Sequence, residues 1–196
     1  MHHVGNNLKT NLTTNDWMNF FYRLFLTFNA TSLILVVFLV KEQVLINEID
    51  CGLVNLPNYI SYLVYFLVPV VMTYLSLLIA RFLSKDNIKE SSILSIEQAN
   101  NTFLPSYLGY FFVALSVPYV ETLIFAFAIL FIFTFLSQTL YFNPLFLVFG
   151  YHFYYLNTTN NVQLFVITKK VLKEPKSIEI EQLRRINNFT FIDIKK

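Results

Sequence analysis

Charged residues, glycine and cysteine are all scarce in this chain, and each shortage excludes a class of protein. Charged residues make up 13% of the 196 residues, and hydrophobic residues make up 56%. A soluble domain carries roughly 25% charged residues, because it needs charge to cover its surface. The mean hydropathy of +0.55 agrees with this contrast. The composition therefore predicts a protein whose solvent is lipid.

The few reactive residues do not form a recognisable catalytic site. Cys51 is the only cysteine, which excludes an intrachain disulfide and a cysteine-rich metal site. The four glycines form no phosphate-binding loop, and the GxSxG, HExxH and CxxC motifs are absent. His152 stands alone in an aromatic run, where a structural role is more common than ligand binding. We therefore expect no enzymatic activity, no catalytic or metal-binding residue and no cofactor.

Long apolar segments predict an α-helical membrane protein with four transmembrane helices, at about residues 20–40, 59–80, 103–117 and 123–140. A helix needs about 20 apolar residues to cross the hydrocarbon core. The third and fourth segments are separated by Pro118 and Glu121, which favour a tight hairpin turn. Pro69 in the second segment removes a backbone hydrogen bond and is expected to kink that helix.

The basic residues predict how these spans are threaded. The N-terminal side, the loop after the second span and the C-terminal tail hold two, three and eight of the 14 Lys and Arg residues, and Lys41 is the exception. The positive-inside rule then places both termini in the cytoplasm. We expect a multi-pass protein of the bacterial inner membrane, with residues 1–19 as a cytosolic N-terminal segment and residues 20–141 as the four-helix region.

Polar side chains inside the spans are interpreted as contacts between helices. Asn29, Ser137 and Gln138 would be costly facing lipid, so we expect them to pack against other helices, within one chain or in a homo-oligomer. No carboxylate lies within a span, so coupled ion transport is not supported. An oligomeric pore lined by such residues remains an alternative.

Residues 142–196 predict a small β-rich cytosolic tail. Asn143 and Pro144 end the last helix. Two β-prone runs, LFLVFGYHFYYL and VQLFVITKK, are joined by the polar turn NTTNN, and this pattern is typical of a β-hairpin. Alternating residues in SIEIEQL and FTFIDI indicate further strands, and SILSI in the loop after the second span indicates another.

Three segments carry a resemblance to a known family. The stretches 143–154 (NPLFLVFGYHFY), 164–170 (LFVITKK) and 100–117 (NNTFLPSYLGYFFVALSV) resemble the KwaA family, the membrane component of the Kiwa antiphage defence system. They cover roughly a third of the chain. The resemblance implies a membrane sensor of phage infection that assembles with itself and with a cytosolic effector, KwaB, which acts on phage DNA processes.

The tail has two interpretations, which can both hold. Its basic residues attract anionic lipid headgroups, or they form a docking surface for the effector. The acids in the tail dilute its positive charge, so direct nucleic-acid binding is not expected. Candidate docking residues are Tyr151, His152, Tyr154, Lys169, Lys170, Arg184 and Arg185.

The resulting hypothesis is a membrane sensor and scaffold that recruits and regulates a cytosolic effector. The alternative is a pore-forming or immunity-type membrane protein that acts in the bilayer without a soluble partner.

Overall fold

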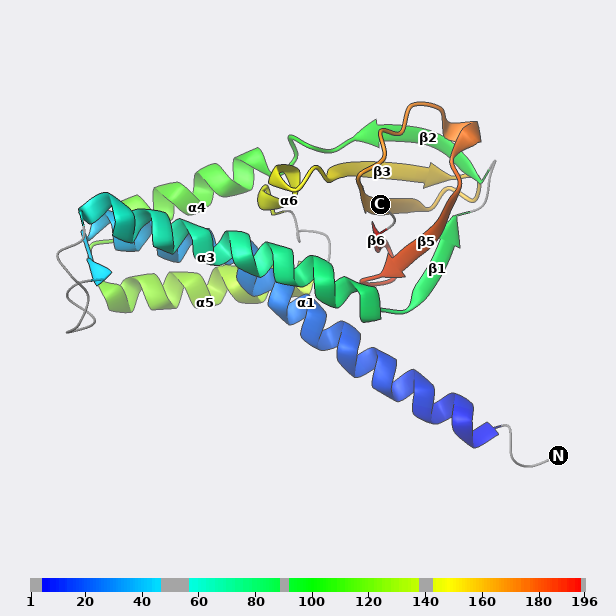
Figure 1. The fold of residues 1–196 in the computed structure, drawn as a ribbon, viewed down its shortest axis with the longest axis horizontal. Coiled ribbons are helices and arrows are strands. Elements are labelled where there is room, and N and C mark those ends of the chain that lie inside the picture. The colour runs from blue at the N-terminus through cyan, green and yellow to red at the C-terminus, as the bar shows by residue number, and fades with distance from the viewer. Residues whose placement is uncertain (1–4, 47–56, 89–91, 138–142, 195–196) are drawn as a thin grey trace. The chain divides into compact units, whose positions relative to one another are not determined.

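The fold consists of long apolar helices and one β-sheet (Figure 1). The computed structural model describes residues 5–46, 57–88, 92–137 and 143–194, with side chains from residue 17 onward. The chain divides into two compact units. The sheet unit comprises residues 1–26, 76–101 and 146–196, and the helix unit comprises residues 27–75 and 102–145.

Among the described residues, three helices are long and apolar enough to cross a membrane. They are α1 (Gly5–Lys41), α3 (Asn58–Ile79), which continues into the short helix η1 (Ala80–Phe82), and α5 (Val120–Ser137). In position, length and composition, these helices agree with three of the predicted spans. The predicted third span is the 13-residue helix α4 (Leu104–Ser116), which is shorter than the roughly 20 residues that a span requires.

Helix α4 nevertheless runs alongside α1 within the helix unit. The Tyr107 hydroxyl donates a hydrogen bond to the Ala30 carbonyl at 2.9 Å, and the Lys41 ammonium group donates to the Val117 carbonyl at the end of α4. The two contacts follow the same order along both helices, so α4 and α1 are parallel. At this end, an apolar cluster joins α1, α4 and the start of α5 through residues Ile34, Phe38, Ala114, Val117 and Leu123.

The sheet combines strands from two distant parts of the chain. Strands β1 (Lys85–Ile88) and β2 (Ile93–Gln98) lie between α3 and α4. Strands β3 (His152–Thr158), β4 (Gln163–Thr168), β5 (Ile180–Arg185) and β6 (Thr190–Asp193) follow α6 (Leu145–Val148), with the short helix η2 (Pro175–Ser177) before β5. The strand order is β1-β5-β6-β4-β3-β2, and only the β4–β6 pair is parallel. The C-terminal strands are therefore central, and the two edges come from the loop.

This sheet curls so that its edges approach each other. Five spacings of about 4.8 Å would place the outer strands of a flat six-stranded sheet about 24 Å apart. Ile88 at the end of β1 and Ile93 at the start of β2 are five positions apart, which the chain can bridge over at most about 18 Å. Both side chains pack in one core cluster with Leu156, Val166 and Leu183. The curled sheet thus encloses its own hydrophobic core.

The structure confirms the predicted hairpin and corrects its start. Strands β3 and β4 pair antiparallel across the NTTNN turn, with Leu156 opposite Leu164. Residues 145–148, predicted as the beginning of a strand, form α6 instead, because the Asn143 side chain accepts a hydrogen bond from the Leu145 amide at 2.9 Å and caps a helical turn. The predicted tail is also incomplete as a folding unit, because β1 and β2 complete its sheet.

The sheet core gives a first prediction. Replacing Leu183, which is 1% exposed, with Ala leaves a cavity beneath β5 and should cost about 2–5 kcal/mol. Hydrogen exchange of the purified protein should then speed up in β1 and β6, the two neighbours of β5. Gln182→Ala, on the exposed neighbouring residue, is the matched control and should leave exchange unchanged. Equal exchange in both variants would contradict the assignment of Leu183 to the core.

Candidate functional site

A buried cluster of polar groups lies inside the helix unit. Asn29 on α1, Thr73 on α3 and Asn143 before α6 are each at most 1% exposed. The Asn29 side-chain amide lies 2.8 Å from the Thr73 hydroxyl, and the Asn143 amide nitrogen donates to that hydroxyl at 3.1 Å. The Thr73 hydroxyl in turn donates to the Pro69 carbonyl at 2.8 Å. The cluster therefore connects three segments that are far apart in the sequence.

The orientation of the Asn29 amide decides how completely the cluster is satisfied. With its nitrogen toward Pro69, that nitrogen donates to the Pro69 carbonyl at 3.2 Å. Its oxygen then accepts from the Asn143 amide at 2.9 Å and lies 2.8 Å from the Thr73 hydroxyl, whose single proton is donated either to this oxygen or to the Pro69 carbonyl. In this orientation both ends of the Asn29 amide have partners, which buried polar groups require.

The other two residues proposed for helix packing are placed differently. The Ser137 side chain is exposed and its hydroxyl donates to the Thr134 carbonyl of its own helix at 3.0 Å. Gln138 lies outside the described residues. Thr134, by contrast, is buried and its hydroxyl lies 3.3 Å from that of Tyr110 on α4. The contact between α4 and α5 thus uses Thr134, which the sequence indicated only as a possible pore-lining residue of an oligomer.

A second candidate site is one end of the sheet, which we call the basal end. It is the end at which β2 and β4 end and β3 starts. The register runs from Ile167 near the end of β4 across Ile192 on β6 to Arg184 on β5 and Lys85 on β1, so these two basic residues lie in a row near this end, although β5 runs opposite to β4. Five basic residues of the strands and of the residues that follow them lie at or near this end: Lys85, Lys169, Lys170, Arg184 and Arg185.

Tyr151 is the buried centre of a charged group at the basal end. The Lys169 ammonium lies 5.0 Å from the centre of the Tyr151 ring, a cation–π geometry. Burial raises the pKa of the Tyr151 hydroxyl above its ordinary value of 10.0. The nearby Asp193 carboxylate raises this pKa further, and the Arg81 guanidinium opposes the shift. Asp193 itself is buried and accepts a hydrogen bond from the Thr168 hydroxyl at 2.9 Å.

Two other predicted docking residues are engaged within the unit. Tyr154 is 3% exposed in the sheet core. His152 is half-buried, with Nδ1 3.1 Å from the Asn100 side-chain nitrogen. Asn100 also accepts a hydrogen bond from the Phe153 amide at 2.8 Å. Tyr154 and His152 therefore contribute to the sheet and to its junction with the loop before α4.

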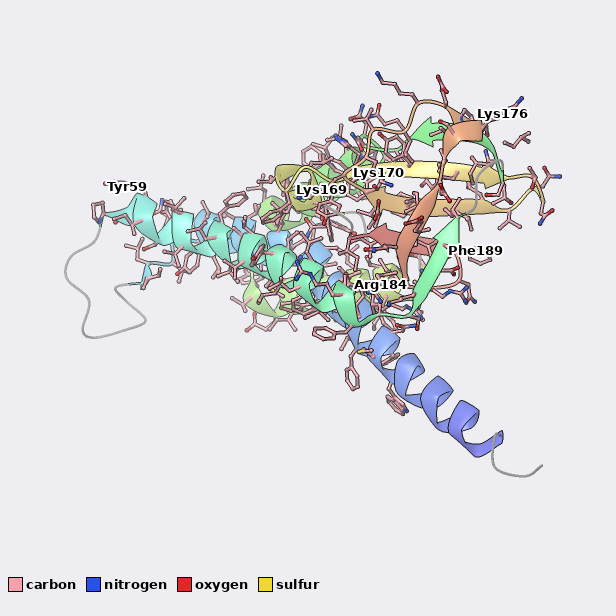
Figure 2. The ribbon with its side chains drawn as sticks, turned by 45° about the vertical axis from the view of Figure 1, so that its right-hand side comes forward. Tyr59, Lys169, Lys170, Lys176, Arg184 and Phe189 are labelled. Atoms are coloured by element: carbon pink, nitrogen blue, oxygen red, sulfur yellow. The ribbon has the colours of Figure 1, made fainter. Side chains whose placement is uncertain are left out.

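The four basic docking candidates differ in how they are held, and three of them, Lys169, Lys170 and Arg184, are labelled in Figure 2. Lys169 and Lys170 are exposed just after β4. Arg185 is exposed and forms an ion pair with Asp86 at 2.7 Å. The Arg184 guanidinium is only partly exposed, and its Nη1 donates to the Leu83 carbonyl at 2.8 Å. Lys169, which contacts the Tyr151 ring, and Lys170, which donates to the Glu179 carbonyl at 3.4 Å, are thus exposed cations with no ion pair among the described residues.

The part of β1 in this site was not predicted from the sequence. Lys85 and Asp86 belong to the polar stretch KDNI, which has no strand-like apolar alternation. The structure brings Lys85 opposite Arg184 and pairs Asp86 with Arg185. The sequence offered only opposite charges in the loop and the tail as a sign that the two segments pair. Such charges do not indicate which residues stand opposite each other. Among the described residues, no group of three or more His, Cys, Asp or Glu side chains is placed to hold a metal ion.

These features define a class of protein in which helices long enough to span a membrane are combined with a β-sheet. In the described residues there are three such helices and one six-stranded sheet. The model of the anti-phage protein KwaA family matches residues 22–192, and the chain belongs to this family. The match runs from within α1 to within β6 and includes every helix and strand between them, and it confirms the resemblance found in the sequence. No curated protein and no solved structure matches the chain. Family membership gives the chain a role in defence against phage.

The polar cluster gives a second prediction. Thr73→Val keeps the side-chain shape but removes the hydroxyl that Asn29 and Asn143 share, so it should lower the stability of the detergent-solubilised protein by about 1 kcal/mol. A lower midpoint of thermal unfolding would report this loss. Thr31→Val is the matched control, because the buried Thr31 hydroxyl donates to the Thr27 and Phe28 carbonyls of its own helix. An equal effect of both substitutions would contradict a special role for the cluster.

The raised pKa of Tyr151 gives a third prediction, at alkaline pH. The pKa of a tyrosine in the unfolded chain is near 10.0 and that of folded Tyr151 is higher. The unfolded state therefore releases this proton first, and stability falls as the pH rises above about 10. Tyr151→Phe should flatten this loss when thermal unfolding is followed from neutral to strongly alkaline pH. Tyr119→Phe, at an exposed ring, should retain the wild-type pH dependence, and an unchanged profile for Tyr151→Phe would refute the assignment.

Proposed function

We propose that this member of the family is a non-enzymatic sensor and scaffold of the bacterial inner membrane, which recruits a KwaB-like cytosolic effector through its sheet. The observation that carries the proposal is which parts of the chain supply the strands of the sheet. Its edge strands β1 and β2 belong to the loop between α3 and α4, whereas its central strands belong to the C-terminal segment. The two edges of the sheet are thus joined through short segments to the end of η1 and the start of α4.

The same observation supports four spans with both termini in the cytoplasm. Strands β2 and β3 are paired, so residues 98 and 152 lie on one side of the membrane. The chain between them contains α4 and α5, and it must cross the membrane an even number of times. Because α5 is long enough to cross, α4 supplies the second crossing. The parallel contact of α4 with α1, from Tyr107 to Val117, agrees with this threading.

Signal transmission is proposed to pass from the helices to the sheet edges. Only Leu83 and Ser84 separate η1 from β1, and Arg184 and Arg185 on β5 are bonded to their carbonyl groups at 2.8 and 2.9 Å. A shift of α3 therefore acts on the β1–β5 pair with little slack. A sensor requires two arrangements with different preference for the disturbed membrane.

The buried polar cluster is the proposed place where the helices change arrangement. The Pro69 carbonyl accepts hydrogen bonds from the Thr73 hydroxyl and from the Asn29 amide on α1, and the Asn143 amide donates to the Thr73 hydroxyl. Proline leaves an interruption in the hydrogen bonds of its helix, which makes a local change of geometry less costly there. Because Asn143 also caps α6, a change at this cluster reaches the residues that lead into β3.

Effector recruitment can be tested by charge reversal at the end of β4. Lys169→Glu with Lys170→Glu should reduce the effector recovered with the tagged full-length protein at least about tenfold, because like charges across an interface cost several kcal/mol. Protection against phage should fall in parallel. Lys173→Glu with Lys176→Glu makes the same charge change elsewhere in the tail and is the control, which should keep both properties.

The outcomes of this experiment separate the two hypotheses. Loss of effector with the first pair alone supports recruitment through the end of β4. Full protection without any bound soluble protein, together with ion leakage from reconstituted vesicles, would instead favour the pore-forming alternative. Point substitutions test recruitment more specifically than deletion of residues 150–196. The deletion removes all four central strands and leaves β1 and β2 without partners.

A further inference from the structure

Two cations stand side by side where the chain leaves α3. Lys85 on β1 and Arg184 on β5 are directly opposite each other in the register. Side chains at such positions share one face of the sheet, with Cβ atoms about 5 Å apart, and like charges there are destabilising. Neither residue forms an ion pair within the described ranges 5–46, 57–88, 92–137 and 143–194. The pair therefore concentrates positive charge at one point on the edge of the sheet.

Arg184 is held in place and stays partly exposed. Its Nη1 donates to the Leu83 carbonyl at 2.8 Å, which fixes the guanidinium at the end of η1. Its Nε is buried, so a ligand can reach only the outer part of the side chain. A planar guanidinium held in this way suits the oxygens of a phosphate group. Lys85 is exposed beside it and can add a mobile ammonium group.

The two cations line a surface cleft. The cleft has a volume of about 280 Å³ and is lined by Lys85, Arg184, Glu181 and Gln182. An irregularity in the β1–β5 register, between Asp86 and Ile88, places Glu181 and Gln182 together on the exposed side. The two bases outnumber the single acid, so the cleft favours an anion.

The position of the cleft relative to the membrane indicates which anion it binds. Lys85 follows Phe82, the last residue of the apolar stretch Asn58–Phe82, by three positions, so the two Cα atoms are at most about 10 Å apart. Phe82 is 71% exposed, and Trp17, in the same unit, is 64% exposed. Exposed aromatic rings of this kind are typical of the interface between membrane and water. The cleft thus lies at the level of the lipid phosphates.

We propose that Lys85 and Arg184 form a binding site for the phosphate of an anionic membrane lipid. The lipid phosphate offsets the repulsion between the two cations and accepts hydrogen bonds from the guanidinium and the ammonium group. A lipid in this position contacts β1 and β5 and connects the edge of the sheet to the membrane surface. The lipid site does not depend on effector recruitment. It uses Lys85 and Arg184 rather than the residues at the end of β4, and lipid binding can be measured on this protein without an effector.

The test is native mass spectrometry of the full-length protein in an uncharged detergent, with added phosphatidylglycerol or phosphatidylcholine of equal chain length. The wild-type protein should retain phosphatidylglycerol preferentially. Lys85→Gln with Arg184→Gln should reduce this preference about 10- to 30-fold, because two cations near a membrane surface contribute roughly additively. Lys173→Gln with Lys176→Gln removes the same charge elsewhere and should keep the preference.

The remaining outcomes are equally decisive. An unchanged preference in the first variant, or an equal loss in both, overturns the site. Displacement of the lipid by millimolar inorganic phosphate assigns the cleft to a soluble anion and overturns a lipid site. If the double variant does not fold, Lys85→Gln alone, at an exposed side chain, should still lower the preference, and no change in that variant overturns the proposal.

Discussion

Backbone pairing between two distant parts of the chain is the constraint on which the rest of this structure depends. Strand β1 is completed by β5, and β2 is completed by β3. These pairs join the loop after α3 to the C-terminal segment. A strand that lacks a neighbour exposes its backbone groups, so neither part forms this sheet without the other. The pairing also requires the loop and the tail to lie on the same side of the membrane.

Inside the helix unit, polar contacts take over the role that hydrophobic burial has in the sheet. Apolar side chains gain little from leaving lipid for another helix, so close packing and hydrogen bonds select the arrangement. The contacts of Asn29 with Thr73, of Tyr107 with Ala30 and of Tyr110 with Thr134 each join a different pair of segments. The helix unit is therefore specified by a few polar contacts, and the sheet unit by a continuous apolar core.

The sequence predicts the helices well because their signal is local. About 20 consecutive apolar residues identify a span, and α1, α3 and α5 follow that rule. The β3–β4 hairpin is also local, because a polar turn joins two β-prone runs. The helix α6 was missed because its cap, a single Asn143 side chain, outweighs the β-propensity of LFLV. Helix α4 lies between these cases, because its 13 residues carry the composition of a span without the usual length.

The candidate sites were less predictable because they depend on long-range register. The sequence identified the bases of the tail, but it contains no signal that sets Lys85 opposite Arg184 across 99 positions. In the same way, burial of Tyr154 follows from the pairing of β3 with two neighbours, which an isolated hairpin does not provide. Asn29 was accessible to prediction because an amide inside an apolar span needs a partner. Its partners Thr73 and Asn143 were not, because helix contacts have no sequence signature.

The order of the strands allows membrane contact and effector binding to coexist at the basal end. Lys85 and Arg184 lie on β1 and β5, whereas Lys169 and Lys170 follow β4, and β6 lies between them. The outer strands of this group, β1 and β4, are three spacings apart, or about 14 Å. A lipid phosphate on one side therefore leaves the other side open to a protein. An effector bound there would be held at the membrane surface, where a shift of α3 changes the β1–β5 pair first and reaches β4 through β6.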